Sequence, residues 1–418
     1  MHVPADPIPT PYTYYPLDDN RQSIRLFRIR SSTGLLELEL RAFCLESPEC
    51  PPFASLSYMW GDQYKSKRIS IDQRSAYITE NAFLFLDTLR QHQARRVEKG
   101  HQGLPRRYTI YASDLDHRGW LWRYPFYASD LRRTSTSSGD YLEDYLEWVW
   151  MDSICINQSD PNERNHQVGL MQKIYGLADH VFFHIGAGWT ERAQSKLDGQ
   201  SDKKSRSLSL PEVTYVINLS EYANRLWIVQ ELVLGNRVSF VTSDDFIPFP
   251  ELENSVDPGL GTLVGNIGKA RELWHNDATA DRRWRGRKLA TLLEEYRNYE
   301  CKENVDRVYG LLGICSEAIP IDYTLSPREL MLKILGHLIP KERDQFLGSY
   351  WISSLIKSLS PALSYALTED DYVALSRQLK SDGGLSASAD DGKSWWYCED
   401  DHLLAKILTF PLIQLDWI

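Results

Sequence analysis

Polar and apolar residues alternate along the first part of the chain, as they do in half-buried strands. Over residues 23–40 this alternation predicts a hairpin or two separate strands. Residues 53–60 set small side chains among large ones and run into a Gly-Asp turn signal, which indicates a compact strand. Another short strand is expected over 68–71. Apolar residues then recur at helical spacing after Thr79, so a helix is expected to follow these strands.

The most informative pattern is a strand, a loop, a helix and a second strand within one short segment. Residues 148–151 are apolar on both faces, which is typical of a strand in a parallel sheet that helices cover. In the helix start that follows, Asp160 suits the cap, Pro161 the first turn and Glu163 the third position of a capping box. Residues 181–185 form the second apolar strand. The segment therefore predicts a βαβ unit with a right-handed crossover.

Polar residues at the end of the first of these strands are candidates for a functional site. Asp152 ends the strand at 148–151, and doubly wound sheets bind ligands at the carboxyl ends of their strands. The polar loop after it contains Asn157 and Gln158. Asp152 has a second reading, in which it holds this loop by accepting backbone hydrogen bonds.

A short helix predicted over 225–234 carries the second group of candidates. Asn224 suits its cap and Gly235 its end. Trp227 and Glu231 stand four residues apart and therefore share a helical face. The residues alone leave two readings of Glu231, a functional carboxylate or a surface glutamate paired with a nearby arginine.

Changes of composition divide the chain into three parts. Residues 1–52 form a β-rich lead-in, residues 53–245 an α/β part, and residues 246–418 a mainly helical C-terminal region. The α/β part contains two polar insertions, near 100–140 and 190–210. The first insertion holds the pentapeptide Tyr-Ala-Ser-Asp-Leu twice, which indicates a local duplication rather than a repeat fold.

Composition and charge narrow the classes of partner. With 47 basic and 57 acidic residues the net charge is −10, which argues against a general nucleic-acid binder, and the basic run at 282–288 is interpreted as a solvated helix face. The chain has no apolar run long enough for a membrane span and no signal-peptide pattern at its start. Six cysteines without CxxC spacing fit free thiols in a reducing compartment, so a soluble cytoplasmic protein is expected.

Three blocks of sequence occur in order and together resemble the fungal heterokaryon-incompatibility (HET) domain. They are Leu-Ser-Tyr-Met-Trp-Gly-Asp at 56–62, Trp-Met-Asp-Ser-Ile-Cys-Ile-Asn-Gln at 150–158 with Glu163 and Gln167 after it, and Arg-Leu-Trp-Ile-Val-Gln-Glu at 225–231. Two flanking pieces, at 15–26 and 306–313, are also similar to HET proteins. The resemblance covers roughly residues 15–315.

The resemblance implies a role in fungal non-self recognition, in which HET domains trigger growth arrest or cell death. It also implies an α/β fold similar to TIR domains, with a flavodoxin-like parallel sheet. Its first strand and the loop that leaves it are expected at 55–61, and its further parallel strands at 148–152, 181–185 and 237–242. In TIR enzymes the helix after the third strand carries a Trp-x-x-x-Glu pattern whose glutamate is catalytic, and Trp227 and Glu231 fall on this pattern.

The same resemblance implies hydrolysis of NAD at the nicotinamide–ribose bond, with NAD as the substrate and with no cofactor or metal. Glu231 would hold the ribose hydroxyls and stabilise oxocarbenium-like charge, with Trp227 shaping the pocket. The residues expected to bind the substrate come from the two strand-end loops and the helix: Trp60, Gly61, Asp62, Asp152, Asn157, Gln158 and Trp227.

The alternative function is a non-catalytic signalling module that self-associates or binds a partner after activation. The partners expected are a second copy, through the TIR-like domain, and an activating protein that the sequence does not identify. The Gly-rich stretch 259–269 lacks the Gly-Lys-Ser/Thr spacing of a phosphate-binding loop. His180 and His184 lie on a strand without an H-E-x-x-H pattern, so no zinc site is expected there.

Overall fold

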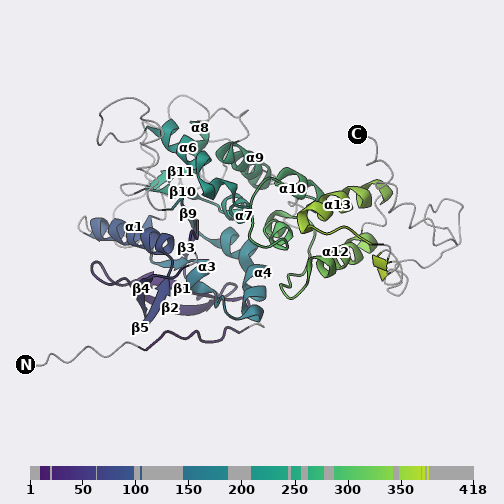
Figure 1. Cartoon of the computed structure of the whole chain (residues 1–418). Coiled ribbons are helices and arrows are strands. Elements are labelled where there is room, and N and C mark those ends of the chain that lie inside the picture. Colours follow the sequence, from purple (N-terminus) through teal and green to yellow (C-terminus); the bar gives the residue numbers. More distant parts are fainter. Residues whose placement is uncertain are drawn as a thin grey trace, which may run out of the picture. The chain divides into compact units, whose positions relative to one another are not determined.

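The described part of the chain forms two compact units, residues 1–280 and residues 281–418. In this computed structural model the described residues are 10–18, 21–62, 64–97, 104–105, 145–186, 209–242, 246–255, 262–276, 287–341, 348–368, 370–371 and 374–375. The first unit contains a large sheet with helices packed on it, and the described residues of the second unit are mainly helical (Figure 1).

The sheet of the first unit has nine strands in its described part, in the order β11-β10-β9-β3-β8-β1-β2-β4-β5. The strands are β1 (Ser23–Ile29), β2 (Glu37–Cys44), β3 (Phe53–Tyr58), β4 (Lys67–Ile71), β5 (Arg74–Ile78), β8 (Trp148–Trp150), β9 (His180–His184), β10 (Val238–Val241) and β11 (Phe246–Pro248). A separate pair joins β6 (Leu104–Pro105) to β7 (Tyr145–Leu146). The helices are α1 (Glu80–Val97), α3 (Asp152–Cys155), α4 (Pro161–Leu177), α6 (Leu210–Leu219), α7 (Trp227–Leu234), α8 (Phe249–Asn254) and α9 (Leu263–Asn276), with the 3-10 turn η4 (Glu221–Asn224) before α7.

Four neighbouring strands in the middle of the sheet, β10, β9, β3 and β8, run parallel. Numbered along the chain, they lie in the spatial order 2-1-3-4. The chain therefore winds in one direction from β3 to β8 and in the other from β8 to β9. Open α/β sheets bind ligands at the carboxyl ends of the strands where this direction changes, here the ends of β3 and β9.

Helices cover both faces of these central strands. Ser57 and Tyr58 are consecutive in β3, so their side chains point to opposite faces. Ser57 contacts Glu231 of α7, whereas the Tyr58 ring lies 6.4 Å from the ring of Phe85 in α1. Helix α4 packs beside α7, so α4 and α7 share one face and α1 covers the other (Figure 1).

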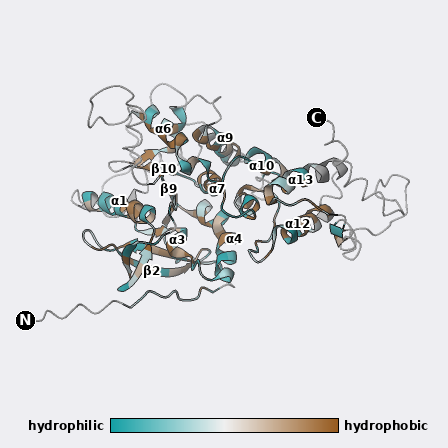
Figure 2. Cartoon of the chain, in the orientation of Figure 1, coloured by the Kyte–Doolittle hydropathy of each residue, from teal (hydrophilic) through white to brown (hydrophobic). Residues whose placement is uncertain are grey.

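Helix α7 is unusual in being buried along almost its whole length. From Ile228 to Leu234 every residue is buried, and Gln230 and Glu231 are the polar members of that run. Helix α1, by contrast, mixes hydrophilic residues with the hydrophobic ones that face the sheet (Figure 2). A glutamate within α7 therefore lies inside the protein and needs partners there.

The observed elements confirm the main predictions from the sequence. Strands β1 and β2 form a hairpin, which was one of the two alternatives predicted over residues 23–40. Strand β8, helix α4 and strand β9 form the predicted strand, helix and strand, with both strands parallel to β3. Helix α1 begins directly after Thr79. The sheet is mixed rather than wholly parallel, because antiparallel strands are added beside β8 and β10.

Two local predictions were wrong in detail. The helix expected from residue 225 begins at Trp227, because η4 occupies the preceding residues and Leu226 takes the cap position predicted for Asn224. At the start of α4, Asp160 caps the amides of residues 162 and 163 as predicted. The carboxylate of Glu163, however, binds Arg25 and a backbone amide elsewhere, so it does not complete a capping box.

The described part of the second unit is helical, as predicted for the C-terminal region. Its helices are α10 (Leu289–Glu295), α11 (Asp306–Tyr309), α12 (Pro327–Lys341) and α13 (Gly348–Leu363), with the 3-10 turn η6 (Leu312–Ile314). Helix α13 packs against both α10 and α12. The boundaries at 52 and 245 stay predictions. The structure adds β1 and β2 to the sheet of the α/β part, and it places α8 and α9 in the first unit.

Some predictions concern residues outside the described part of the chain. The duplicated pentapeptide at 111–115 and 127–131, most of both insertions, and three arginines of the basic run at 282–288 are among them. Within the described part, no helix combines the length and the apolar character needed to cross a membrane.

Candidate functional site

The carboxyl end of β3 connects all three sequence blocks. The Ser57 hydroxyl donates to Glu231 Oε2 at 2.5 Å. One residue later, the backbone carbonyl of Tyr58 accepts a hydrogen bond from Arg225 Nη1 at 2.5 Å. Beyond the strand, the indole nitrogen of Trp60 donates to Asp152. The loop after β3 therefore joins the segment before α7 on one side and the loop after β8 on the other.

Glu231 lies in a buried polar cluster on the face of the sheet that α7 covers. The residue is only 7% exposed, so it is not a surface glutamate. Its partner Ser57 also lies 2.6 Å from the hydroxyl of Tyr222, and both of these side chains are buried. Because Ser57 gives its single proton to Glu231, Tyr222 must donate to the Ser57 oxygen. Burial raises the pKa of Tyr222 well above its usual value, which keeps it a donor.

The environment of Glu231 shifts its acidity towards neutrality. Burial raises the pKa of Glu231 to about 7, whereas the hydrogen bond from Ser57 and the positive charge of Arg225 lower it. The negative charge of Asp152 adds to the rise. A carboxyl group with this pKa changes its charge near physiological pH, a property that is more frequent at functional sites than elsewhere.

Asp152 stands at the end of β8, where the sequence predicted it, and its contacts fit the reading in which it holds the following loop. Its carboxylate accepts from the Trp60 indole at 2.9 Å and from the amide of Ser153 at 2.7 Å. Burial raises the pKa of Asp152, and the charge of Arg225 opposes that rise. Its backbone carbonyl accepts from Gln158 Nε2 at 3.1 Å. Asp152 thus holds its own loop while keeping a contact with the loop after β3.

The remaining candidates from the two loops make local contacts. Asn157 accepts from the hydroxyl of Ser159 at 2.7 Å, and exposed Asp62 accepts from the amide of Tyr64 at 3.0 Å. Trp227 is partly exposed at the start of α7. The structure therefore places both Trp60 and Gln158 in contact with Asp152, and the binding roles of all the candidates stay predictions.

The backbone conformation and the close packing at residue 61 both favour glycine. Its φ angle is +65°, a region that other residues rarely adopt, and a Cβ atom here would lie 2.4 Å from Asn81 Nδ2. Asn81 donates to the carbonyl of Met59 at 3.1 Å, and it also lies against the positive-φ residue Gly186 after β9. Asn81 therefore packs under the loops that follow β3 and β9.

A residue with a side chain loses about 1–2 kcal/mol when its backbone is left-handed. Replacing Gly61 with alanine is expected to lower the free energy of unfolding by more than this amount. The additional loss comes from displacing Asn81. Gly34→Ala is the matched control, because Gly34 has a φ of +72° and nothing within 4 Å of the added Cβ. Urea unfolding of both variants measures the difference. Equal losses would contradict a packing role for Asn81.

Helix α7 is held at its C-terminal end by side chains from α9. Buried Arg271 donates to the carbonyls of Gly235 at 2.7 Å and of Leu232, and the His275 ring lies 3.0 Å from the carbonyl of Val233. Arginine and histidine side chains near the end of a helix can bind its free carbonyls in this way. The described end of the Gly-rich stretch lies within α9, so these residues form a helix rather than a phosphate loop.

Several residues of the site were missed from the sequence. Four residues were not assigned to the site from the sequence: Ser57, Tyr222, Arg225 and Asn81. Alternate residues of a strand point to the same face of the sheet. The position of Ser57 within β3 could therefore have indicated which face its side chain lies on. Tyr222 sits in a short 3-10 turn that no periodic pattern marks.

Taken together, these features define an α/β protein with helices on both faces of a mixed sheet and a buried carboxylate beneath the carboxyl end of its first parallel strand. Residues 129–231 match the family model described as "Heterokaryon incompatibility protein (HET)". That range contains the second and third blocks of the resemblance.

A curated relative is also a heterokaryon incompatibility protein. The chain is similar to heterokaryon incompatibility protein 6, OR allele, of Neurospora crassa, with 24% identity over 386 residues that cover 75% of this chain and 51% of the relative. The chain thus spans about half the length of this relative. No solved structure matches the chain. Both matches are therefore to heterokaryon incompatibility proteins, and the family match lies within residues 129–231.

Proposed function

We propose that this protein acts in fungal non-self recognition and cell death by hydrolysing NAD, with Glu231 as the catalytic carboxylate. The observation that carries the proposal is a buried glutamate of raised pKa, bound to Ser57 where the first parallel strand ends. The strand order 2-1-3-4 supports it, because it equals the first four strands of the flavodoxin-like order that the TIR resemblance implies.

The reaction needs little chemistry from the protein. The bond between nicotinamide and ribose breaks with its electron pair moving to the nicotinamide nitrogen, which is already cationic in NAD and becomes neutral on leaving. Water adds to the ribose carbon and loses one proton, so NAD and water give ADP-ribose, nicotinamide and a proton. The ionised carboxylate of Glu231 stabilises the positive charge that develops on the ribose.

The residues around Glu231 then have defined tasks. Ser57 orients the carboxylate, and Arg225 keeps it partly ionised despite its burial. Trp60 and Asp152 form the more accessible rim, where the substrate is held. Because Glu231 is only 7% exposed, substrate access requires the rim loops to separate, or a second subunit to complete the site. A second copy and an activating protein are the partners proposed, in the cytoplasm.

The test is NAD consumption by the purified full chain at high protein concentration. Glu231→Gln is expected to lower the rate by about a hundredfold or more, because it removes the charge that stabilises the transition state. Glu272→Gln is the matched control, since Glu272 is an exposed glutamate of α9. Turnover that persists undiminished in Glu231→Gln would remove Glu231 from the active site.

A second candidate function is a non-catalytic module that self-associates after activation. The observation that favours it is the same burial, since a carboxylate bonded to Ser57 inside the protein also fits a structural role. Cell death that survives Glu231→Gln but is lost when self-association is disrupted would favour this module over the enzyme.

A further inference from the structure

The N-terminal segment contributes to the framework of the candidate site. Residues 10–17, named the N-terminal strap, are anchored at one end on β5, where the amide of Tyr12 donates to the carbonyl of Ser75 at 2.8 Å. Further along, the hydroxyl of Tyr14 donates to the carbonyl of Ile154 at 2.9 Å. The strap therefore runs from β5, at the edge of the sheet, to the loop that follows β8, residues 151–160, whose first turn is α3.

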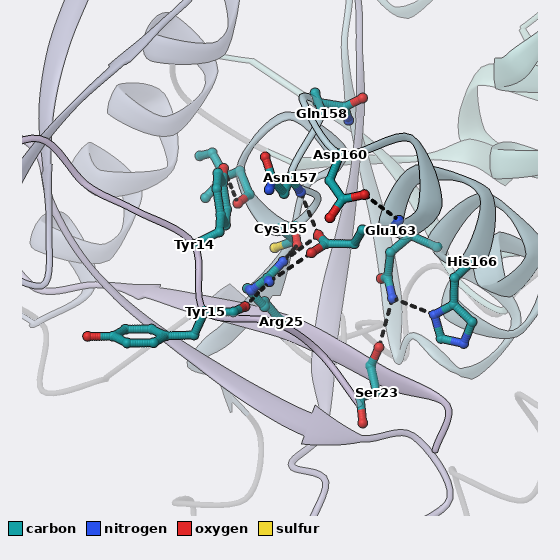
Figure 3. Close-up of polar contacts among 12 residues, drawn as sticks. Tyr14, Tyr15, Ser23, Arg25, Cys155, Asn157, Gln158, Asp160, Glu163 and His166 are labelled. Atoms are coloured by element: carbon teal, nitrogen blue, oxygen red, sulfur yellow. Dashed lines mark hydrogen bonds and ion pairs between the residues drawn. The ribbon is translucent and has the colours of Figure 1, made fainter. Parts of the chain in front are cut away.

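A buried ion pair holds the same loop from beneath (Figure 3). Arg25 in β1 and Glu163 in α4 form two hydrogen bonds, at 2.6 and 3.0 Å, with side chains only 3% and 7% exposed. Arg25 also donates to the carbonyl of Cys155 at 3.1 Å and to the carbonyl of Tyr15 in the strap. Glu163 accepts from the amide of Asn157 at 2.6 Å.

Three successive points of the loop are thus fixed by side chains from outside it. The carbonyl of residue 154 is bound by Tyr14, the carbonyl of residue 155 by Arg25, and the amide of residue 157 by Glu163. The loop also closes on itself, because Gln158 donates to the carbonyl of Asp152. Residues 154–157 are therefore connected to Asp152 through the backbone of the loop and through the Gln158 side chain.

We infer that Tyr14, Arg25 and Glu163 are positioning residues that set the contact between Asp152 and Trp60. None of the three touches the rim itself, and each acts through the backbone of the loop. The inference rests on the proposed function only where it concerns substrate binding at Asp152. The positional part concerns the 2.9 Å bond between Asp152 and the Trp60 indole and is tested without any substrate.

Tyr14 offers the cleanest substitution. Its ring lies 4.9 Å from the Arg25 guanidinium carbon, so phenylalanine preserves the cation–π contact and removes only the hydroxyl. Burial raises the pKa of Tyr14 well above its usual value, so the phenol is a constant donor. Tyr309→Phe is a matched control, because Tyr309 in α11 of the second unit also donates to a backbone carbonyl, that of Asp322, at 2.9 Å.

The deciding experiment measures hydrogen exchange of the Trp60 indole N–H in the full chain, with the signal assigned by its loss in Trp60→Phe. Tyr14→Phe is expected to speed this exchange about fivefold, the equivalent of one hydrogen bond, and Tyr309→Phe is expected to leave it unchanged. An unchanged rate in Tyr14→Phe, or equal acceleration in both variants, would overturn the inference.

Substitutions at Arg25 add a second readout. Arg25→Lys retains the charge and is expected to restore most of the protection that Arg25→Met loses. In the NAD assay, Tyr14→Phe is expected to raise KM about fivefold with kcat unchanged, since the reacting group Glu231 is not moved. A wild-type protein that consumes no NAD would remove the proposed function, while the exchange result would still decide the positioning role.

Discussion

Replacing Glu231 with glutamine is expected to raise the free energy of unfolding at pH 8 by about 3 kcal/mol. The folded-state pKa of Glu231 is about 7, against 4.5 for an ordinary glutamate. The folded protein therefore binds this proton more tightly than the unfolded chain does. The resulting stabilisation is complete below about pH 4.5 and is lost as the pH rises through about 7. Glutamine resembles the protonated form and avoids the loss.

Urea unfolding at pH 5 and pH 8, followed by tryptophan fluorescence, measures this effect. The stabilisation by Glu231→Gln should be large at pH 8 and small at pH 5. The exposed control Glu272→Gln should change neither value. A glutamine variant that is less stable than the wild type at pH 8 would show that favourable partners hold the ionised carboxylate, and it would contradict a destabilising charge at Glu231.

The same substitution at Glu163 is expected to have the opposite sign. Glu163→Gln should lower the free energy of unfolding at pH 8 by about 3 kcal/mol, because it leaves the charge of Arg25 buried without its anion. The amide oxygen of glutamine can still accept one bond from Arg25, so the loss lies at the low end for a broken buried pair. The carbonyls of Tyr15 and Cys155 also retain their bonds to Arg25.

The two glutamates therefore form a matched comparison. Both are buried members of the sequence blocks, and both receive the same change of one oxygen for one nitrogen. Opposite changes in the urea midpoint at pH 8 would separate a glutamate that stabilises the fold from one that weakens it. Equal decreases in the urea midpoint would mean that Glu231 and Glu163 both stabilise the fold.

Local patterns predicted much of the secondary structure because strands and helices differ in period. The apolar runs at 148–151 and 181–185, and the cap at Asp160, are signals contained within a few neighbouring residues. Glu163 shows the limit of such signals. Its place in a capping box was inferred from neighbouring residues alone. In the structure its carboxylate binds Arg25, which lies 138 residues earlier in the chain.

The candidate site itself depends on contacts between distant parts of the chain. Ser57 and Glu231 are 174 residues apart, and their bond requires β3 to lie under α7 with the correct parity. No periodic pattern specifies which strand lies next to which. The TIR resemblance supplied that arrangement as an expectation for Glu231 but carried no information on Tyr222 or the N-terminal strap.

The rim residues Trp60 and Asp152 and the buried residue Glu231 have different roles in the proposed site. Trp60 and Asp152 are partly exposed and joined through the loops after β3 and β8, whereas Glu231 lies beneath them and is bound to Ser57. The destabilisation expected from the ionised form of Glu231 is typical of residues kept for function rather than for the fold. The cost to stability and the proposed catalysis therefore have the same origin, the negative charge of Glu231.

The most direct test of catalysis by Glu231 is the rate of NAD consumption by the wild-type protein between pH 6 and pH 8. A carboxyl group with a pKa of about 7 is about one tenth ionised at pH 6 and about nine tenths ionised at pH 8, so the rate is predicted to rise about tenfold. Glu231→Gln is predicted to show no such rise and to be slower than the wild type by about a hundredfold or more at pH 8. A rate that is flat across this range and retained in Glu231→Gln would contradict a catalytic role for this carboxylate.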